Sequence, residues 1–249
     1  MIIFDVGAHD GKDSIRILNK FTRRRYYGEM RQRPVNKTNI DFKFSDEDKV
    51  YAFEPTPYLV DRFLRVLERG LPGTFIPIQT AVSDVEGPVK FYVAGHKLGC
   101  SSLHEFSDDL DETWPEVRDF KATDEIEVPA IRLDTFINEN KIEQVDHFHC
   151  DVQGHDLRVL KSLGDDIEKV VSGRVEAYNY NPIYKNTDNS VPLIIEYLES
   201  KGMTVKSKEI LLKRGHKDPM PENYQGHKFK EVNIKFYGPR YNKVHTIPV

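Results

Sequence analysis

The stretch DVGAHDG, which follows an apolar run at the start of the chain, has the residue types of a nucleotide-binding turn. A glycine-bearing turn between a strand and a helix lets a ligand approach the backbone N–H groups closely. A P-loop has four residues between its glycines, and then Lys followed by Ser or Thr. Here three residues separate Gly7 from Gly11, and Lys12 is followed by Asp13, so the magnesium-binding hydroxyl is missing. The turn is therefore not that of an NTPase.

The same turn argues against a dinucleotide. The G-x-G-x-x-G fingerprint seats a pyrophosphate on a helix N-terminus. In this chain the middle glycine is replaced by Ala8, and Asp5 and Asp10 place carboxylates where a pyrophosphate would approach. Those carboxylates, together with close approach at Gly7, favour a ligand with a cationic end. S-adenosylmethionine carries an ammonium and a sulfonium, and it is the cofactor that the turn predicts.

Two later predicted strand ends carry groups that suit the rest of an adenosyl ligand. Glu54, in VYAFEP, is placed to accept hydrogen bonds from ribose hydroxyls, and Ser83 and Asp84, in TAVSD, are placed to face the adenine. Such residues at strand ends also commonly cap the following helix. Three suitable strand ends in chain order together predict one adenosyl site.

Residues at the ends of two further predicted strands could act on an acceptor. Methyl transfer to a hydroxyl requires the oxygen to lose a proton, and a base within hydrogen-bond reach assists this. Asp151 ends strand 147–152, His155 begins the next helix, and Glu176 ends strand 169–176. We predict these three as the catalytic residues, although His155 also fits a helix surface. A metal-assisted variant, in which Asp151 and His155 bind a metal together with Glu176 or Asp84, stays open. The spacing is not diagnostic of a metal site, and we predict none.

The elements that must position these residues alternate between short β-rich runs and segments of helical periodicity. This alternation predicts a parallel sheet with helices on both faces. The predicted strands are 2–6, 50–54, 74–82, 88–93, 147–152, 169–176, 203–207 and 231–237. The predicted helices are 13–21, 57–69, 133–141, 155–163 and 191–201. Ligands of such sheets bind at the carboxyl ends of the strands, where the predicted site residues lie.

The length of 249 residues suits one domain, 1–249, with an insertion at about 23–49. The insertion is too long for an ordinary connection between a helix and a strand. It opens with Arg23-Arg24-Arg25-Tyr26-Tyr27, which suits either a solvated insertion or a lid that grips phosphates and stacks on rings.

Bulk properties disfavour a nucleic-acid partner and give no indication of a membrane partner. A net charge of −4 gives no global attraction to nucleic acid or to anionic membranes. No apolar run approaches the roughly 18–20 residues of a membrane span, and the N-terminus has no signal-peptide pattern. Cys100 and Cys150 are expected to be free thiols in a cytoplasmic protein. The expected partner is a small-molecule or glycan acceptor, and the sequence does not indicate the oligomeric state.

The segments that contain the predicted site resemble the FkbM family of S-adenosylmethionine-dependent methyltransferases. The resembling segments, in the order of the family, are FDVGAHDGKDS (4–14), YAFEPTPYLVDRF (51–63), TAVSDVEGPVKFYV (80–93), GCSSL (99–103), RLDTFI (132–137) and VDHFHCDVQGHDLRVLKSL (145–163). The last is the most specific, because the family usually shows a K-I-D-V-E/Q-G-x-E-x-x-V-L-K-G-like run there.

The resemblance implies an α/β, Rossmann-like methyltransferase fold with a mostly parallel seven-stranded sheet, helices on both faces and an antiparallel last strand. It also implies methyl transfer, most often to a hydroxyl of a sugar or natural product. By the same resemblance, Asp5, Gly7 and His9 line the methionine side of the cofactor, Glu54 the ribose, and Ser83-Asp84 the adenine.

The predicted function is thus O-methylation of a hydroxyl on a sugar, glycan or small metabolite. RNA methylation is an alternative because of the basic cluster from Arg23 to Arg33. A catalytically silent adenosyl-binding module is another, because His149 stands where the family usually has Lys, and His155-Asp156 where it has a small residue and Glu.

Overall fold

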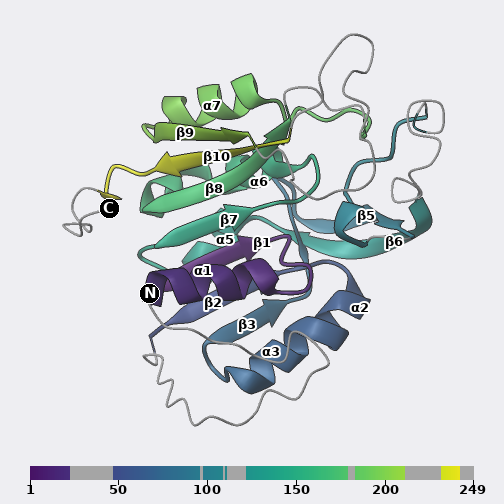
Figure 1. Ribbon diagram of the computed structural model, residues 1–249, viewed down its shortest axis with the longest axis horizontal. Helices are drawn as coiled ribbons and strands as arrows, with labels where there is room; N and C mark the ends of the chain where they lie inside the picture. The colour runs from purple at the N-terminus through teal and green to yellow at the C-terminus, as the bar shows by residue number, and fades with distance from the viewer. Residues whose placement is uncertain are drawn as a thin grey trace.

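The computed structural model describes residues 1–22, 47–95, 98–108, 110, 122–178, 183–210 and 231–241. Across these residues the main sheet has seven strands: β1 (Ile2–Val6), β2 (Lys49–Phe53), β3 (Phe75–Ile78), β7 (His147–Cys150), β8 (Ser172–Tyr178), β9 (Thr204–Ile210) and β10 (Glu231–Tyr237). Their spatial order is β3-β2-β1-β7-β8-β10-β9 (Figure 1). The first five in this order are parallel, and β10 is antiparallel to both β8 and β9. The predicted sheet with an antiparallel last strand is confirmed.

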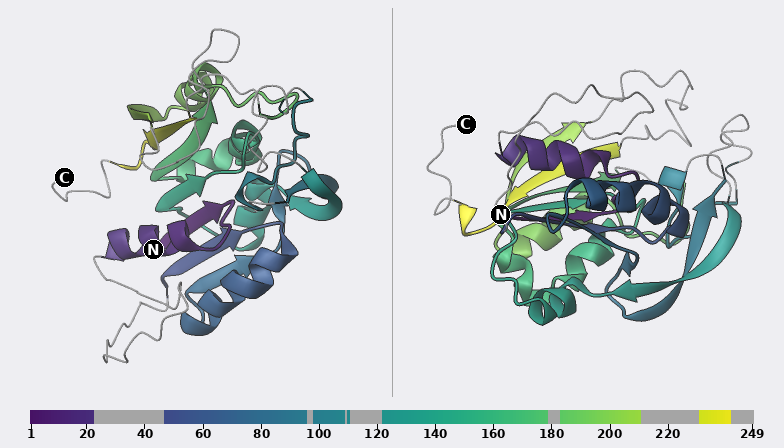
Figure 2. Two further views of the ribbon diagram at one scale, coloured as in Figure 1. Left: turned by 45° about the vertical axis from the view of Figure 1, so that its right-hand side comes forward. Right: turned by 90° about the horizontal axis from the view of Figure 1, so that it is seen from below.

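Helices cover both faces of this sheet (Figure 2). One face carries α1 (Lys12–Thr22) and the continuous helical segment formed by α2 (Pro57–Leu59), a π-helical turn (Val60–Leu64) and α3 (Arg65–Gly70). The other face carries α5 (Leu133–Glu139), α6 (Asp156–Ser162) and α7 (Val191–Ser200). Both predicted layers of helices are therefore present, and each encloses its own apolar core against the sheet.

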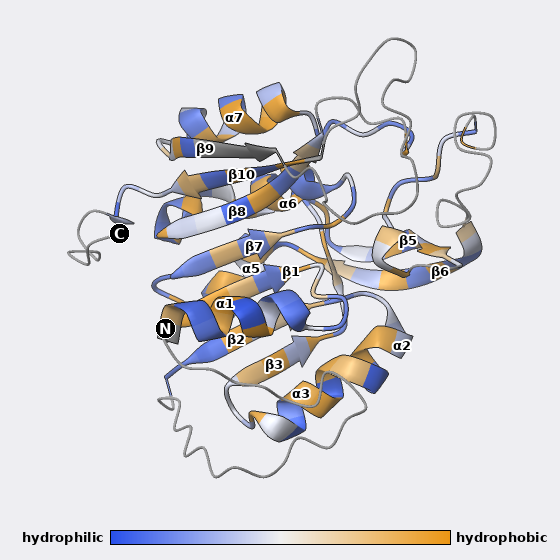
Figure 3. Cartoon of the chain, in the orientation of Figure 1, coloured by the Kyte–Doolittle hydropathy of each residue, from blue (hydrophilic) through white to orange (hydrophobic). Residues whose placement is uncertain are grey.

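The local sequence explains why the elements nearest the site form. Strand β1, with the sequence IIFDV, has four of its five residues buried, as expected for a strand covered on both faces. Helix α1 buries Ile15 and Leu18 against the sheet and leaves Arg16 exposed, which is the helical periodicity that predicts it. Figure 3 shows that the helices covering the sheet carry both hydrophobic and hydrophilic residues, as expected for amphipathic helices.

A second sheet of three strands was not predicted. It contains β4 (Ala81–Val82), β5 (Gly87–Ala94) and β6 (Ala122–Ile131), in the order β4-β6-β5. The predicted strand 74–82 is split between the two sheets by a turn at Thr80, whose hydroxyl donates to the carbonyl of Pro129 at 2.9 Å. Strand β6 escaped prediction because the first four of its ten residues are exposed and the alternation of apolar residues is confined to Ile126, Val128 and Ala130.

The topology places a crevice at the carboxyl ends of β1 and β7. These strands are neighbours in the sheet, but the chain leaves β1 toward β2 and leaves β7 toward β8, on opposite sides. Such a reversal of strand order opens a crevice in which α/β proteins bind ligands. Figure 1 shows β5 and β6 beyond this edge of the sheet.

Two sequence predictions concern other parts of the chain. Most of the predicted insertion, residues 23–46, lies outside the described residues, as does its basic cluster from Arg23 to Arg33. Among the helices that the structure does describe, none has the length and apolarity that crossing a bilayer requires.

Candidate active site

A cleft lies at the carboxyl ends of β1, β2 and β7 and extends to β4 and β5. Its lining contains five of the nine predicted site residues: Gly7, His9, Glu54, Asp151 and His155. The rest of the lining combines apolar side chains with small polar ones: Val6, Phe53, Pro55, Thr80, Ala81, Val82, Phe91, Leu98, Gly99, Ser101, Leu103, Val152 and Gln153. The fold therefore brings the carboxyl ends of β1, β2 and β7 to one site, as expected for an α/β sheet of this class.

Gly7 lets the turn after β1 pack directly on the end of β7. Its φ of +82° belongs to the left-handed region, which glycine adopts readily. A Cβ at this position would collide with the carbonyl oxygen of Asp151. The N–H groups of Gly7 and Ala8 both donate to the carbonyl of Phe53 at 3.0 Å, so the turn is fixed to β2 as well.

Glu54 is buried at the end of β2 and presents its carboxylate to the cleft. One carboxylate oxygen accepts the backbone N–H of Thr56 at 2.8 Å, and the other accepts that of His9 at 2.9 Å. Burial raises the pKa of Glu54, and the hydrogen bonds from Thr56 and His9 oppose this shift. Each oxygen keeps a lone pair, so the fixed carboxyl group can accept from the hydroxyls of a ligand.

His9 lies at the same edge of the cleft, with Nδ1 of its ring 3.8 Å from Asp10 Oδ1. The neighbouring Asp10 carboxylate raises the pKa of His9 more than burial lowers it. Burial acts to raise the pKa of Asp10, but the bonds from His9 and Lys12 outweigh it and lower that pKa. A protonated imidazole can bind an anionic ligand group such as an amino-acid carboxylate.

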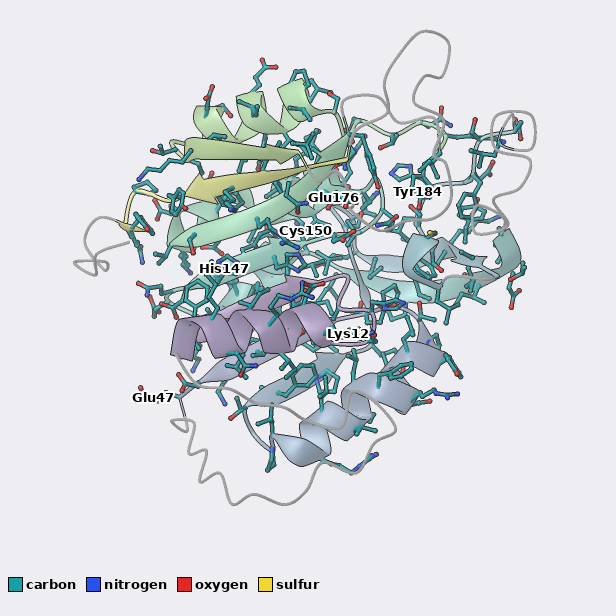
Figure 4. The ribbon with its side chains drawn as sticks, in the orientation of Figure 1. Lys12, Glu47, His147, Cys150, Glu176 and Tyr184 are labelled. Atoms are coloured by element: carbon teal, nitrogen blue, oxygen red, sulfur yellow. The ribbon has the colours of Figure 1, made fainter. Side chains whose placement is uncertain are left out.

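Asp151 lines the cleft just after β7, and its side chain is held by a residue that the sequence did not reveal. The amide nitrogen of Gln153 donates to Asp151 Oδ1 at 2.7 Å and lies 3.3 Å from Glu176 Oε2. Glu176 is only 1% exposed and lies on β8 (Figure 4). Tyr178 also donates to Glu176 Oε2, at 2.9 Å. The two predicted catalytic carboxylates are thus joined, but Asp151 alone of the two lines the cleft.

His155 belongs to a chain of polar contacts with Ser83 and His104. Ser83 Oγ lies 3.0 Å from His155 Nε2, and His155 Nδ1 lies 3.0 Å from His104 Nε2. Burial lowers the pKa of His155 to about 3, and His104 lowers it further. His155 is therefore neutral near pH 7 and poorly suited to take a proton, and Ser83 is buried behind it. No local sequence signal indicates His104, because it pairs with a residue 51 positions away.

The remaining predicted residues are engaged within the fold. Asp5 is fully buried, with one carboxylate oxygen bonded to Ser14 and the other 2.7 Å from His149 Nδ1. Arg174 lies 2.8 Å from the other ring nitrogen of His149. Asp84 pairs with Arg158 at 3.0 Å. Asp5, Ser83, Asp84 and Glu176 thus do not line the cleft, and their functional roles stay predictions.

The segment 98–104 lines part of the cleft and is anchored to residues that follow β7 in the chain. Ser102 Oγ donates to the carbonyl of Gln153 at 2.8 Å, and the hydroxyl of Tyr184 donates to the carbonyl of Cys100 at 2.8 Å. These contacts close one side of the cleft with residues that resemble the Ser-Ser-Leu run of the family. Cys100 and Cys150 are both free thiols.

The donor set fits S-adenosylmethionine better than a metal ion. Within the described ranges, His, Cys, Asp and Glu side chains do not form a group of three that could hold a metal. Carboxylates at Glu54 and Asp151 suit hydroxyls and cationic groups, His9 suits a carboxylate, and the apolar side chains near Val82 and Phe91 suit a ring. The ligand groups that these residues suit are those of an adenosyl amino acid.

Comparison with known proteins agrees with this chemistry. The model of a family described as the methyltransferase FkbM domain matches residues 5–204. The hexuronic acid methyltransferase AglP of Haloferax volcanii is 25% identical over 126 residues, which are 51% of this chain and 46% of that protein. The chain thus matches less than half the length of this relative.

Two solved structures are similar to the whole chain at low identity. M. capricolum TrmK in complex with S-adenosyl-homocysteine has a TM-score of 0.43 and 12% identity, and the match covers 96% of this chain and 62% of that one. Precorrin-6y C5,15-methyltransferase from Geobacter metallireducens GS-15 has a TM-score of 0.41 and 11% identity, over 96% and 80%. The family model, which covers most of the chain, settles the classification: the protein belongs to the FkbM methyltransferase family.

Proposed function

We propose that the protein is an S-adenosylmethionine-dependent O-methyltransferase that acts on a hydroxyl of a sugar, a glycan or a small hydroxylated metabolite. S-adenosylmethionine is the cofactor of this family, and it supplies a methyl group activated by a sulfonium. The observation that carries the proposal is the position of Asp151, which lines the cleft where the turn at Gly7 packs on the end of β7.

Three residues of the cleft would bind the cofactor. Glu54 would accept hydrogen bonds from the ribose hydroxyls, because backbone N–H groups fix its carboxylate at the end of β2. His9 would bind the carboxylate of the methionine portion, and Gly7 would let that portion approach the backbone. Ser83 would contribute through His155, the residue it contacts at 3.0 Å.

Asp151 would act as the base for the acceptor. The bound cofactor would supply the methyl group and be left as neutral S-adenosylhomocysteine. Asp151 would take up the proton of the acceptor hydroxyl and lose its negative charge. Proton acceptance by a positioned carboxylate accounts for about 10²–10⁴-fold in rate, and positioning of the acceptor for more.

The relative named a hexuronic acid methyltransferase supports a sugar acceptor, although it matches this chain only in part. The alternative of RNA methylation depends on the cluster from Arg23 to Arg33, which lies outside the described residues. The alternative of a silent module is based on His149 and His155. His149 contacts Asp5 and Arg174 and does not line the cleft, which weakens this alternative, whereas His155 does line it.

The test is a methyl-release assay on the full chain with a panel of neutral glycosides, uronides and a short RNA, with product analysis by NMR. We expect S-adenosylhomocysteine to form with a hydroxylated sugar and the product to carry an O-methyl group. Transfer to RNA, with binding that weakens steeply as salt rises, would establish the alternative instead. Cofactor binding without release of methyl to any of these acceptors would overturn the proposal.

A further inference from the structure

Gln153 holds a backbone conformation that its residue type does not favour. It follows β7 in the run DVQG and has a φ of +56°. A left-handed conformation costs a non-glycine residue roughly 1–2 kcal/mol, and Gly or Asn tolerates it better than Gln. Such strain persists only where surrounding contacts impose it, and it gathers at functional sites.

The amide of Gln153 has polar neighbours at both its nitrogen and its oxygen. The nitrogen donates to Asp151 Oδ1 at 2.7 Å and faces Glu176 Oε2 at 3.3 Å. The oxygen lies 3.1 Å from the hydroxyl of Tyr184, whose single proton is shared with the carbonyl of Cys100 at 2.8 Å. Ionised carboxylates only accept hydrogen bonds, so the nitrogen of the amide must be the atom that faces them. The orientation of the amide is therefore set by its neighbours.

The two bridged carboxylates differ in access. Glu176 is 1% exposed, and the hydroxyl of Tyr178 donates to the same carboxylate oxygen that faces Gln153. Asp151 lines the cleft next to Gly7. The two N–H groups of one amide thus tie the accessible carboxylate to a buried one, and this tie fixes the direction in which Asp151 points.

We propose that Gln153 is a positioning residue that couples Glu176 to Asp151 and orients Asp151 as the base for the acceptor hydroxyl. This inference rests on the proposed function for its catalytic meaning, but the coupling itself can be measured without an acceptor. Glu176 then acts through Gln153 as a second positioning residue and does not touch the acceptor.

The chain offers a matched control. Gln144 donates from its amide nitrogen to Asp146 Oδ1, also at 2.7 Å and also two residues away, on the loop before β7 and outside the cleft lining. Gln144→Met therefore removes a hydrogen bond of the same kind without touching the proposed site. Gln153→Met keeps the length of the side chain and the strained backbone but removes the donor.

Carboxyl carbon-13 NMR of the full chain tests the coupling directly. We expect Glu176→Gln to move the Asp151 carboxyl signal in the wild-type background and to leave it in place in the Gln153→Met background. Gln144→Met should leave the Asp151 signal, and its response to Glu176→Gln, unchanged. A response of Asp151 to Glu176→Gln that survives in Gln153→Met, or no response in either background, would overturn the proposal.

Kinetics with the best sugar of the methyl-release panel then tests the catalytic consequence. Gln153→Met should lower kcat about 10-fold or more, with the Kd for S-adenosylhomocysteine within about 3-fold of wild type. In the Asp151→Asn background the same substitution should change kcat by less than about 2-fold, because residues that act as a unit are not additive. If Gln153→Met lowered kcat as much in the Asp151→Asn background as in the wild type, Gln153 would have a general structural role and the proposal would be wrong. Absence of turnover in the wild type would contradict the proposed function and not the coupling.

Discussion

Asp151 is the residue on which the proposed chemistry depends most directly. It is accessible from the cleft, and it has a fixed hydrogen bond from Gln153. The other two predicted catalytic residues differ from it, because Glu176 is buried and burial lowers the pKa of His155 to about 3. A base must lie within reach of the acceptor hydroxyl. Asp151 lines the cleft, and Gln153 holds its side chain in place.

Replacing Asp151 with Asn should separate binding from chemistry. The amide cannot accept the acceptor proton, so we expect turnover to fall about 10²–10⁴-fold. The Kd for S-adenosylhomocysteine should stay within a few-fold of wild type, as measured by calorimetry. Turnover equal to that of the wild type would remove Asp151 from the mechanism.

Asp5 is a residue whose predicted role can be tested against a structural one. Its carboxylate is bonded to Ser14 and His149 and does not line the cleft. We expect Asp5→Ala to lower the free energy of unfolding by roughly 3–5 kcal/mol, the usual cost of removing one partner of a buried pair. Urea denaturation measures this loss, and Asp5→Asn, which keeps an acceptor, should lose less. A normally stable Asp5→Ala protein that fails to bind S-adenosylhomocysteine would instead support direct contact with the cofactor.

At the scale of the elements, the site depends on how closely the turn after β1 packs on the end of β7. The backbone of Gly7 occupies a position in which a methyl group would overlap the Asp151 carbonyl. Gly73 has a similar φ of +74°, but a Cβ added there would meet no atom within 4 Å. The two glycines thus share a conformational requirement and differ in their surroundings.

This pair gives a controlled test of the turn. Gly73→Ala should cost roughly 1–2 kcal/mol of unfolding free energy, which is the strain of the left-handed backbone alone. Gly7→Ala should cost more, because β1 and β7 must also move apart, and it should weaken binding of S-adenosylhomocysteine. Thermal denaturation and calorimetry on both variants measure the two effects. Equal stability losses with unchanged binding in Gly7→Ala would show that close packing at the turn is unimportant.

The elements also show what could be predicted from the sequence. The main sheet could be predicted because its strands are apolar runs between turn residues, and β1 and β10 have the predicted bounds. The second sheet could not, because β6 is largely exposed. Gln153 and His104 were missed because their roles arise from contacts with Glu176 and His155, which lie far from them in the chain. The spacing of Gln153 from Asp151 was the one local signal for it.

At the scale of the whole molecule, buried titratable groups make stability depend on pH in two opposing ways. Burial lowers the pKa of His147 and that of His155 to about 3, from 6.5. Between these values the unfolded chain binds protons that the folded chain does not, so folding stability falls as the pH falls from about 6.5 toward 3. Burial raises the pKa of Asp156 from 3.8 to about 7. In that interval the folded chain retains a proton, so this group lowers stability as the pH rises.

Urea denaturation between pH 4 and pH 8 should resolve both contributions. We expect His155→Gln to reduce the loss of folding stability as the pH falls below about 6.5. In this range the wild-type residue takes up a proton in the unfolded chain but not in the folded chain, and Gln takes up none in either. Asp156→Asn should reduce the loss of folding stability that occurs as the pH rises from about 4 to about 7, because the amide does not ionise. Parallel pH profiles for wild type and both variants would contradict the assigned burial of these groups.

Calorimetric titration of the full chain with S-adenosylhomocysteine tests most directly whether this cleft is the cofactor site of an FkbM methyltransferase. The geometry predicts one binding site per chain, with affinity reduced about 10-fold or more in Glu54→Ala, because the ribose hydroxyls would lose their fixed acceptor. Gly73 does not line the cleft, so Gly73→Ala should bind S-adenosylhomocysteine with the affinity of the wild type. Absence of binding heat with both S-adenosylhomocysteine and S-adenosylmethionine, or full affinity in Glu54→Ala, would contradict the assignment of this cleft.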